Sequence, residues 1–141
     1  MKKIFSLLLL SISMAVAIYA QKTKVPAAVT DAFNAKFPGA TELKWDKENS
    51  KELEANFKFN NSIVSANFGL DGSWKETETT INASELPPAV TNAVNTKYPG
   101  STVFLTERIE KPGNKTFYEV NIKFKGKKKE LELDPEGHFV E

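Results

Sequence analysis

Acid–base catalysis in this chain would have to use a single histidine. His138 is the only histidine among 141 residues, and the chain contains no cysteine. A Ser/His/Asp triad would need His138 as its base, but neither a nucleophile motif nor a second candidate base accompanies it near the C-terminus. His138 is better explained as an ordinary histidine on the surface or half-buried in a strand. We therefore predict that the protein is not an enzyme and has no catalytic residue.

Metal binding is the second chemistry that these side chains could support. Asp134, Glu136 and His138 do not have the spacing of a closed zinc site. Asp71 and its neighbours offer too few ligands for an EF-hand loop. Turn formation accounts for these acids better. We therefore predict no cofactor and no metal. A small-ligand or calcium carrier that uses a groove between two lobes remains the alternative to the binding function given below.

A cluster of lysines forms a third candidate, at Lys125, Lys127, Lys128 and Lys129. Such a cluster could attract nucleic acid. However, acidic residues follow at once, and lysines on an exposed strand also prevent edge-to-edge pairing. We interpret this basic tip as a solvated hairpin that protects a strand edge, and we expect no nucleic-acid partner.

The elements that must position these residues include a segment that occurs twice. Residues 26–41 recur 61 positions later at 87–102, and ten of the sixteen aligned pairs are identical. Each copy opens on proline, continues with apolar residues three and four apart, and ends in Pro-Gly, which is typical of a short amphipathic helix. We expect one helix at Pro26–Lys36 and a second after Ser84, which could cap it.

Alternating apolar and polar residues predict strands after each helix. In the first copy they are expected at 42–46, 53–59, 63–68 and, less regularly, 74–80, with turns at 60–62 and 71–72. In the second copy they are expected at 102–110, 118–124, 131–133 and 138–140. Each copy thus presents one helix stripe and one apolar sheet face, which together predict a two-layer α/β sandwich.

The polar side of these strands is the remaining candidate site. It has mixed charge with a few apolar residues, which is typical of a protein-binding surface and equally of an ordinary solvated sheet face. The partner-binding candidates chosen from it are Lys44, Lys58, Ile63, Asn67, Phe117, Glu119 and Lys123.

The first twenty residues have the pattern of a secretory signal peptide. Lys2 and Lys3 precede an apolar run that is too short to span a bilayer. We predict cleavage after Ala20, although cleavage after Ala17 also fits, and a periplasmic or secreted protein without stable membrane insertion. The remaining chain has a net charge of −1, which gives it no field for collecting nucleic acid or anionic membrane.

The repeated motifs also resemble a known family. A helix that opens on Val-Pro-Ala-Ala-Val and closes on Lys-Phe-Pro-Gly-Ala-Thr, a strand with Trp45, then Glu-Ala-Asn-Phe and an Asp-Gly turn, resemble the PepSY-like family. Its members are β-lactamase-inhibitor-like exported proteins, mainly of Bacteroidetes. The resemblance covers Val25 to Glu141. It implies a tandem α/β repeat with an open sheet face, and the binding or inhibition of another protein.

Together these inferences predict an α+β protein, β-lactamase-inhibitor-protein-like, built as a tandem repeat of two helix-plus-antiparallel-strand units. We expect a signal peptide at 1–20, a first repeat at 21–82 and a second at 83–141. The expected function is non-enzymatic binding or inhibition of an envelope protein or peptide through the open sheet face.

Overall fold

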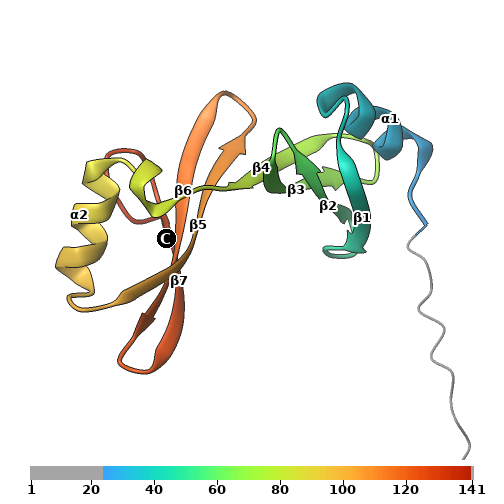
Figure 1. The fold of residues 1–141 in the computed structure, drawn as a ribbon. Coiled ribbons are helices and arrows are strands. Elements are labelled where there is room, and N and C mark those ends of the chain that lie inside the picture. Colours follow the sequence, from blue (N-terminus) through green and yellow to red (C-terminus); the bar gives the residue numbers. More distant parts are fainter. Residues whose placement is uncertain (1–23, 141) are drawn as a thin grey trace, which may run out of the picture.

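The computed structural model describes residues 24–140, so the predicted signal peptide lies outside the described residues. It contains two helices, one 3₁₀ turn and seven strands (Figure 1). Their bounds are α1 (Ala27–Lys36), β1 (Thr41–Lys47), β2 (Glu52–Phe59), β3 (Ser62–Gly69), β4 (Trp74–Thr80), η1 (Ala83–Glu85), α2 (Pro88–Lys97), β5 (Thr102–Lys111), β6 (Lys115–Phe124) and β7 (Lys127–Leu133). No helix in this part of the chain is long and apolar enough to cross a membrane.

Proline and glycine define both ends of each helix. The N-cap of α1 is Pro26, in extended conformation at φ −61°, and the N–H of Phe37 closes the last turn on the Phe33 carbonyl. Gly39 follows at φ +87°, a left-handed conformation that only glycine adopts readily. The second helix repeats this exit at Gly100, with φ +76°.

The start of α2 differs from the prediction for Ser84. This residue lies inside η1, and Asn82 and Glu85 form the capping box of that short turn. Helix α2 itself begins at Pro88, with Pro87 as its N-cap and no side-chain cap. Proline can start a helix without a polar cap because its N–H is absent and its φ is already helical.

The seven strands form one antiparallel sheet in the order β1-β2-β3-β4-β5-β6-β7, so every strand pairs with its neighbour in the sequence. Tight turns make this possible. At the β2–β3 hairpin Asn60 and Asn61 both have positive φ, at 50° and 65°, as a type I′ turn requires. Ser62, expected in the turn, already pairs with Phe59.

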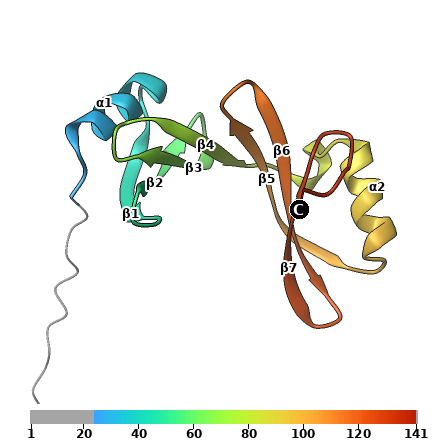
Figure 2. The same cartoon turned by 180° about the vertical axis from the view of Figure 1, so that it is seen from behind.

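Both helices lie on the same face of the sheet, as the strand register shows. Ala66 of β3, which packs near α1, pairs with Thr77, and Thr77 pairs with Glu110 of β5. Following β5 along the same side leads to Thr106, which pairs with the buried Val120 near α2. The helices cover opposite ends of the twisted sheet (Figure 1; Figure 2), and its other face carries no helix.

The buried apolar residues form two clusters, one under each helix. The first contains Val29, Phe33, Phe37, Leu53, Ala55, Phe57, Val64, Ala66 and Phe68. The second contains Leu86, Val90, Val94, Val120, Ile122, Leu131 and Leu133. Where the first cluster has Phe33, Phe57 and Phe68, the corresponding positions of the second copy hold Val94, Ile122 and Leu133. The first cluster is therefore aromatic and the second largely aliphatic.

Candidate functional site

The sheet face opposite the helices, here called the open face, contains all seven candidate residues predicted from the sequence. Lys58 pairs directly with Ile63, and Phe117 pairs with Ile109. By the same alternation Lys44, Asn67, Glu119 and Lys123 point to this side. Ile63 is 65 % exposed, so the first half of the face displays an apolar side chain to solvent.

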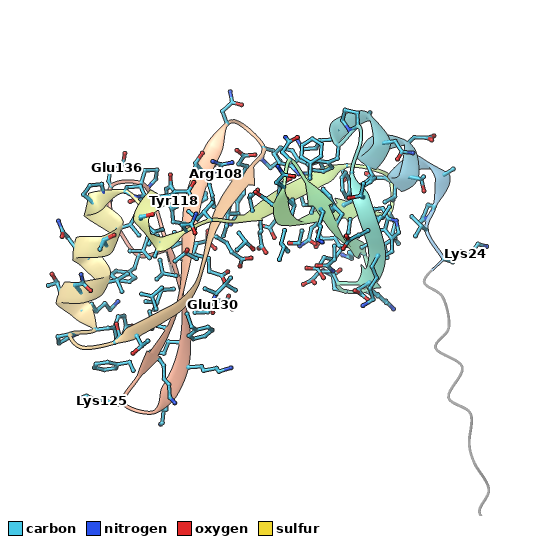
Figure 3. All side chains as sticks on the ribbon, in the orientation of Figure 1. Lys24, Arg108, Tyr118, Lys125, Glu130 and Glu136 are labelled. Carbon is cyan, nitrogen blue, oxygen red and sulfur yellow. The ribbon has the colours of Figure 1, made fainter. Side chains whose placement is uncertain are left out.

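Charges on the open face are segregated rather than mixed. Its centre is acidic, and the contributing residues are Glu54, Glu76, Glu78, Glu107, Glu119, Glu130 and Glu132. Figure 3 labels Glu130 within this group. The lysines of β1 and β2 lie at the edge, where Lys44 pairs with Asp46 at 2.9 Å and Lys58 with Glu42 at 2.8 Å.

Three central carboxyl groups have raised pKa values. Burial raises the pKa of Glu78 to about 7, against the opposing effect of a hydrogen bond from Ser65, and repulsion from Glu76, Glu107 and Glu119 adds to the rise. Repelling, partly dehydrated carboxylates are costly to maintain, and such arrangements are common at functional sites.

Glu107 and Glu119 follow the same pattern. Burial raises the pKa of Glu107, a hydrogen bond from Thr80 lowers it, and the charges of Glu130 and Glu54 raise it again. Burial also raises the pKa of Glu119, partly offset by its bond from the Asn121 amide. Glu54 belongs to β2 and Glu107 to β5, so the acidic field extends across both halves of the sheet.

Lys111 is the cation that lies within this acidic centre. Its Nζ is 2.8 Å from Glu132 Oε1 and 3.7 Å from Glu76 Oε2, and it lies 4.9 Å from the centre of the Phe117 ring. Burial lowers the pKa of Lys111, but the hydrogen bond and charge of Glu132, together with Glu76, outweigh this and raise it overall. Two carboxylates and an aromatic ring thus bind one ammonium group.

An apolar floor lies beside the carboxylates. Ile109 is only 2 % exposed although it points to the open face, between its pairing partners Glu78 and Phe117. It belongs to neither of the two core clusters. The centre of the open face therefore combines half-buried carboxylates with buried and aromatic apolar surface.

Sequence reasoning missed Glu76, Glu78, Glu107 and Ile109 as members of this face. The alternation of Glu76 and Glu78 with threonine in β4 was a usable signal for a strand with one acidic side. The pairing of β4 with β5 gave no such signal, because it joins residues on either side of α2. Only this pairing places Glu78 against Ile109.

His138 lies away from the open face, in the turn after β7. Its backbone N–H donates to Asp134 Oδ1 at 2.8 Å, and its Nδ1 lies 2.8 Å from Oδ2 of the same carboxylate. The side chain is 77 % exposed. Within residues 24–140 no group of three or more His, Cys, Asp or Glu side chains is arranged to hold a metal ion.

The predicted basic tip is the β6–β7 hairpin, which turns at Lys125 and Gly126 (φ 48° and 78°). Figure 3 shows Lys125 at its far end. Three of its lysines, Lys125, Lys128 and Lys129, lie over aromatic rings, with Lys128 Nζ 5.3 Å from the Phe104 ring centre. Strand β7 is an edge strand of the sheet, which agrees with the expected protection of an edge.

A shallow depression lies where the segment after β4 crosses β5. It has a volume of about 240 Å³ and is lined by Thr80–Ala83 and Val103–Thr106. The hydroxyl of Thr106 donates to the Ile81 carbonyl at 2.7 Å, so this polar group already has a partner within the chain. The depression therefore offers few free polar groups to orient a small ligand.

Comparison with solved structures shows that the fold is shared by proteins of Bacteroides. A DUF2874 family protein from Bacteroides uniformis matches with a TM-score of 0.76 at 23% identity, over 84% of this chain and 88% of that one. A BLIP-like protein from Bacteroides fragilis matches with a TM-score of 0.71 at 27% identity, over 84% and 86%. A protein from Bacteroides eggerthii, described as "putative periplasmic", matches with a TM-score of 0.74 at 21% identity, over 84% and 88%.

A family model gives the same assignment from sequence. No functionally curated protein matches the chain significantly. The model described as "Putative beta-lactamase-inhibitor-like, PepSY-like" matches residues 51–141, which runs from the turn before β2 to the end of the chain. This region includes β4, β5 and β6 and hence the acidic centre of the open face. The resemblance noted in the sequence is thereby confirmed, and the chain belongs to the PepSY-like, beta-lactamase-inhibitor-like family.

Proposed function

We propose that this protein is a non-enzymatic, exported module that binds or inhibits a protein or peptide in the periplasm through its open face. The observation that carries the proposal is the centre of that face. No other described element covers it, yet it combines repelling, half-buried carboxylates with the buried Ile109. Keeping such a surface costs stability, and binding a partner offsets that cost.

The family supports an inhibitor-like role, since its description is beta-lactamase-inhibitor-like. An exported location is supported by the expected signal peptide and by the "putative periplasmic" description of the Bacteroides eggerthii relative. The seven candidate residues are the proposed outer contacts: Lys44, Lys58, Ile63, Asn67, Phe117, Glu119 and Lys123.

The proposed organisation is two repeats, at 21–82 and 83–141, that form a two-layer arrangement with both helices on one face. Equivalent contacts support it. Lys36 Nζ lies 3.5 Å from the Trp74 ring centre, and Lys97 Nζ lies 3.9 Å from that of Phe139. A two-layer arrangement leaves the opposite face of the sheet free along its whole length for one extended partner.

Site-specific photo-crosslinking in living cells tests the binding face. A photoreactive phenylalanine analogue replaces Ile63 or Lys123 on the open face, and Asn34 or Asn95 on the exposed sides of the helices. All four side chains are exposed, so the substitutions leave the core intact. We expect a discrete adduct with one partner from Ile63 and Lys123, read by mass spectrometry, and none from the helix positions.

The matched helix positions make the experiment decisive. Asn34 and Asn95 are equivalent residues of the two sequence copies, so they report the helical side of both halves. Adducts formed at these two positions, or formed equally at all four, would refute the open face as the binding surface. Exchanging Lys58 and Lys123 for glutamate should also change the adduct yield at Ile63 severalfold if the lysines contact the partner.

A further inference from the structure

The open face already binds one cation of the chain itself, the Lys111 ammonium group. The Lys111 ammonium is held by Glu132 at 2.8 Å and Glu76 at 3.7 Å, and its Nζ lies over the Phe117 ring. The pattern consists of carboxylates from neighbouring strands and an aromatic ring beneath the side chain. Aliphatic stems of lysine and arginine pack well on such apolar surface while their charged ends reach the carboxylates.

A second set of carboxylates on the same face lacks a cation. Glu78, Glu107 and Glu119 come from the three adjacent strands β4, β5 and β6. Among residues 24–140 none of the three has a lysine, arginine or histidine nitrogen within 4.0 Å, and their hydrogen bonds go to Ser65, Thr80 and Asn121. Glu107 and Glu119 are direct cross-strand partners, a placement that destabilises a sheet when both are charged.

Two further groups of the open face suit a cationic guest. The buried Ile109 pairs with Glu78 and gives an apolar floor next to its carboxylate. Asn67 Oδ1 is buried and accepts no hydrogen bond from any described residue, while its Nδ2 donates to Glu76 at 3.1 Å. A guanidinium presents five N–H donors in a plane and can serve several acceptors at once.

We propose that the partner bound by the open face inserts an arginine or lysine side chain between Glu78, Glu107 and Glu119, with its stem on Ile109. This inference rests on the binding function proposed above and specifies the chemistry of the partner. The occupant is a basic, extended segment of a protein. Its arginine or lysine side chain would bind the second set of carboxylates as the Lys111 ammonium binds the first.

Charge complementarity favours this occupant over an anionic or neutral one. The three acids lie across β4–β6, and neighbouring strands are about 4.8 Å apart, so they span roughly the width of one guanidinium with its hydration shell. Lys111 is bound to Glu132 and Glu76. Lys58 and Lys123 lie at the ends of the face, so they do not neutralise Glu78, Glu107 and Glu119. An acidic segment would meet repulsion there.

Titration with a defined peptide tests the proposal. The probe is a blocked heptapeptide with arginine at every second position and glycine or serine between, so that the arginines share one side when extended. Its control has citrulline, a neutral isostere, in place of each arginine. Both are titrated into the exported protein at low salt, and backbone amide shifts in the NMR spectrum report both affinity and location. We expect the arginine peptide to shift residues of β4–β6 and the citrulline peptide to bind at least ~10-fold more weakly.

Two triple variants separate the site from the overall charge. The combination of Glu78→Gln, Glu107→Gln and Glu119→Gln removes the three acids and relieves their repulsion, so we expect it to fold. The combination of Asp31→Asn, Glu48→Gln and Glu136→Gln makes the same change in charge at exposed positions outside the open face. The first should lose at least ~10-fold in affinity for the arginine peptide, whereas the second should stay within about twofold because long-range charge is screened.

The outcomes are distinct. Equal binding of arginine and citrulline peptides, equal losses in both triple variants, or no binding overturns the proposal. So does calcium binding that requires the three glutamates in the absence of peptide binding, because the site would then be a metal site. A charge-based contact should weaken in roughly 0.5 M salt because salt screens it. If a partner crosslinks at Ile63 but neither the glutamate variant nor this salt lowers the adduct yield, the open-face function stands and the cationic partner is refuted. If no partner crosslinks there, the proposed function itself fails.

Discussion

At the scale of single residues, the carboxyl of Glu78 couples the open face to pH. Burial and the repulsion from Glu76, Glu107 and Glu119 raise its pKa to about 7 in the folded protein, whereas the unfolded chain has the ordinary value of 4.5. Between these two values the folded state binds more protons than the unfolded state. The free energy of unfolding therefore falls as pH rises from about 4.5 to about 7.

This sign gives a measurable prediction for Glu78→Gln. The glutamine side chain carries no charge at any pH. Relative to this variant, the free energy of unfolding of the wild type should therefore fall by roughly 1–2 kcal/mol between pH 5 and pH 8, after discounting for the half-exposed Glu78 side chain. Urea unfolding of both proteins at pH 5, 6, 7 and 8 measures the difference. Taking the variant relative to the wild type cancels the contribution of titrating groups that do not interact with Glu78. Parallel curves across this range would contradict the prediction.

At the scale of elements, two glycines allow the turns after β3 and β7 to lie against the helices. A Cβ on Gly72 would be 2.6 Å from the Ala28 carbonyl oxygen of α1, and a Cβ on Gly137 would be 2.6 Å from the Ala89 oxygen of α2. Both residues also have positive φ, at +85° and +87°. Each turn therefore approaches the first turn of its helix more closely than any side chain allows.

We expect Gly72→Ala to destabilise the protein more than Gly39→Ala. Gly39 has a similar φ of +87° but nothing within 4 Å of its hypothetical Cβ. Its substitution should cost about 1 kcal/mol for the backbone conformation alone. Gly72→Ala adds a clash with backbone and should cost at least about 2 kcal/mol. Urea denaturation measures the loss of stability in both variants. Equal losses would contradict the prediction, because they would show that the turn after β3 shifts away from α1 without cost.

The elements also show which parts of the structure the sequence determines locally. The first helix was predicted to within one residue because Pro26 and Pro38-Gly39 limit it, and strands β2 and β3 were predicted to within one residue because their alternation is regular. The predicted α+β class and the strand Trp74–Thr80 are confirmed. These features depend on residues close together in the chain.

What the sequence did not reveal depends on pairing across a long separation. Thr77 pairs with Glu110, and α2 lies between them in the chain. Without this register, Glu78, Glu107 and Ile109 appear only as residues of two separate expected strands. All seven candidate residues were assigned to the correct side of the sheet, because the side follows from alternation alone. The acidic centre was missed because it follows from register.

At the scale of the whole molecule, the two apolar clusters are joined mainly by the four residue pairs between β4 and β5. Both tryptophans, Trp45 and Trp74, pack against the first cluster. Their fluorescence therefore reports the first half of the protein, while far-UV circular dichroism reports the backbone of both halves.

Phe33→Ala tests how strongly the halves depend on each other. Phe33 contacts four aromatic rings, the nearest being Phe57 with 4.9 Å between ring centres, so its loss should cost about 3–5 kcal/mol. We expect the fluorescence transition in urea to move to lower concentration than the dichroism transition. Coincident transitions in the variant would show that the halves unfold as one unit.

The strand order β1 to β7 also has a consequence for how the protein forms. Each strand finds its partner in the strand that precedes it, so most contacts close short loops, and such topologies fold fast. A chain synthesised from its N-terminus can complete β1–β4 under α1 before α2 has appeared. Each later strand then pairs with the exposed edge of the sheet that has already formed. Assembly ends with β7, the strand that carries the lysines, so the last exposed edge is also the one protected against pairing with another chain.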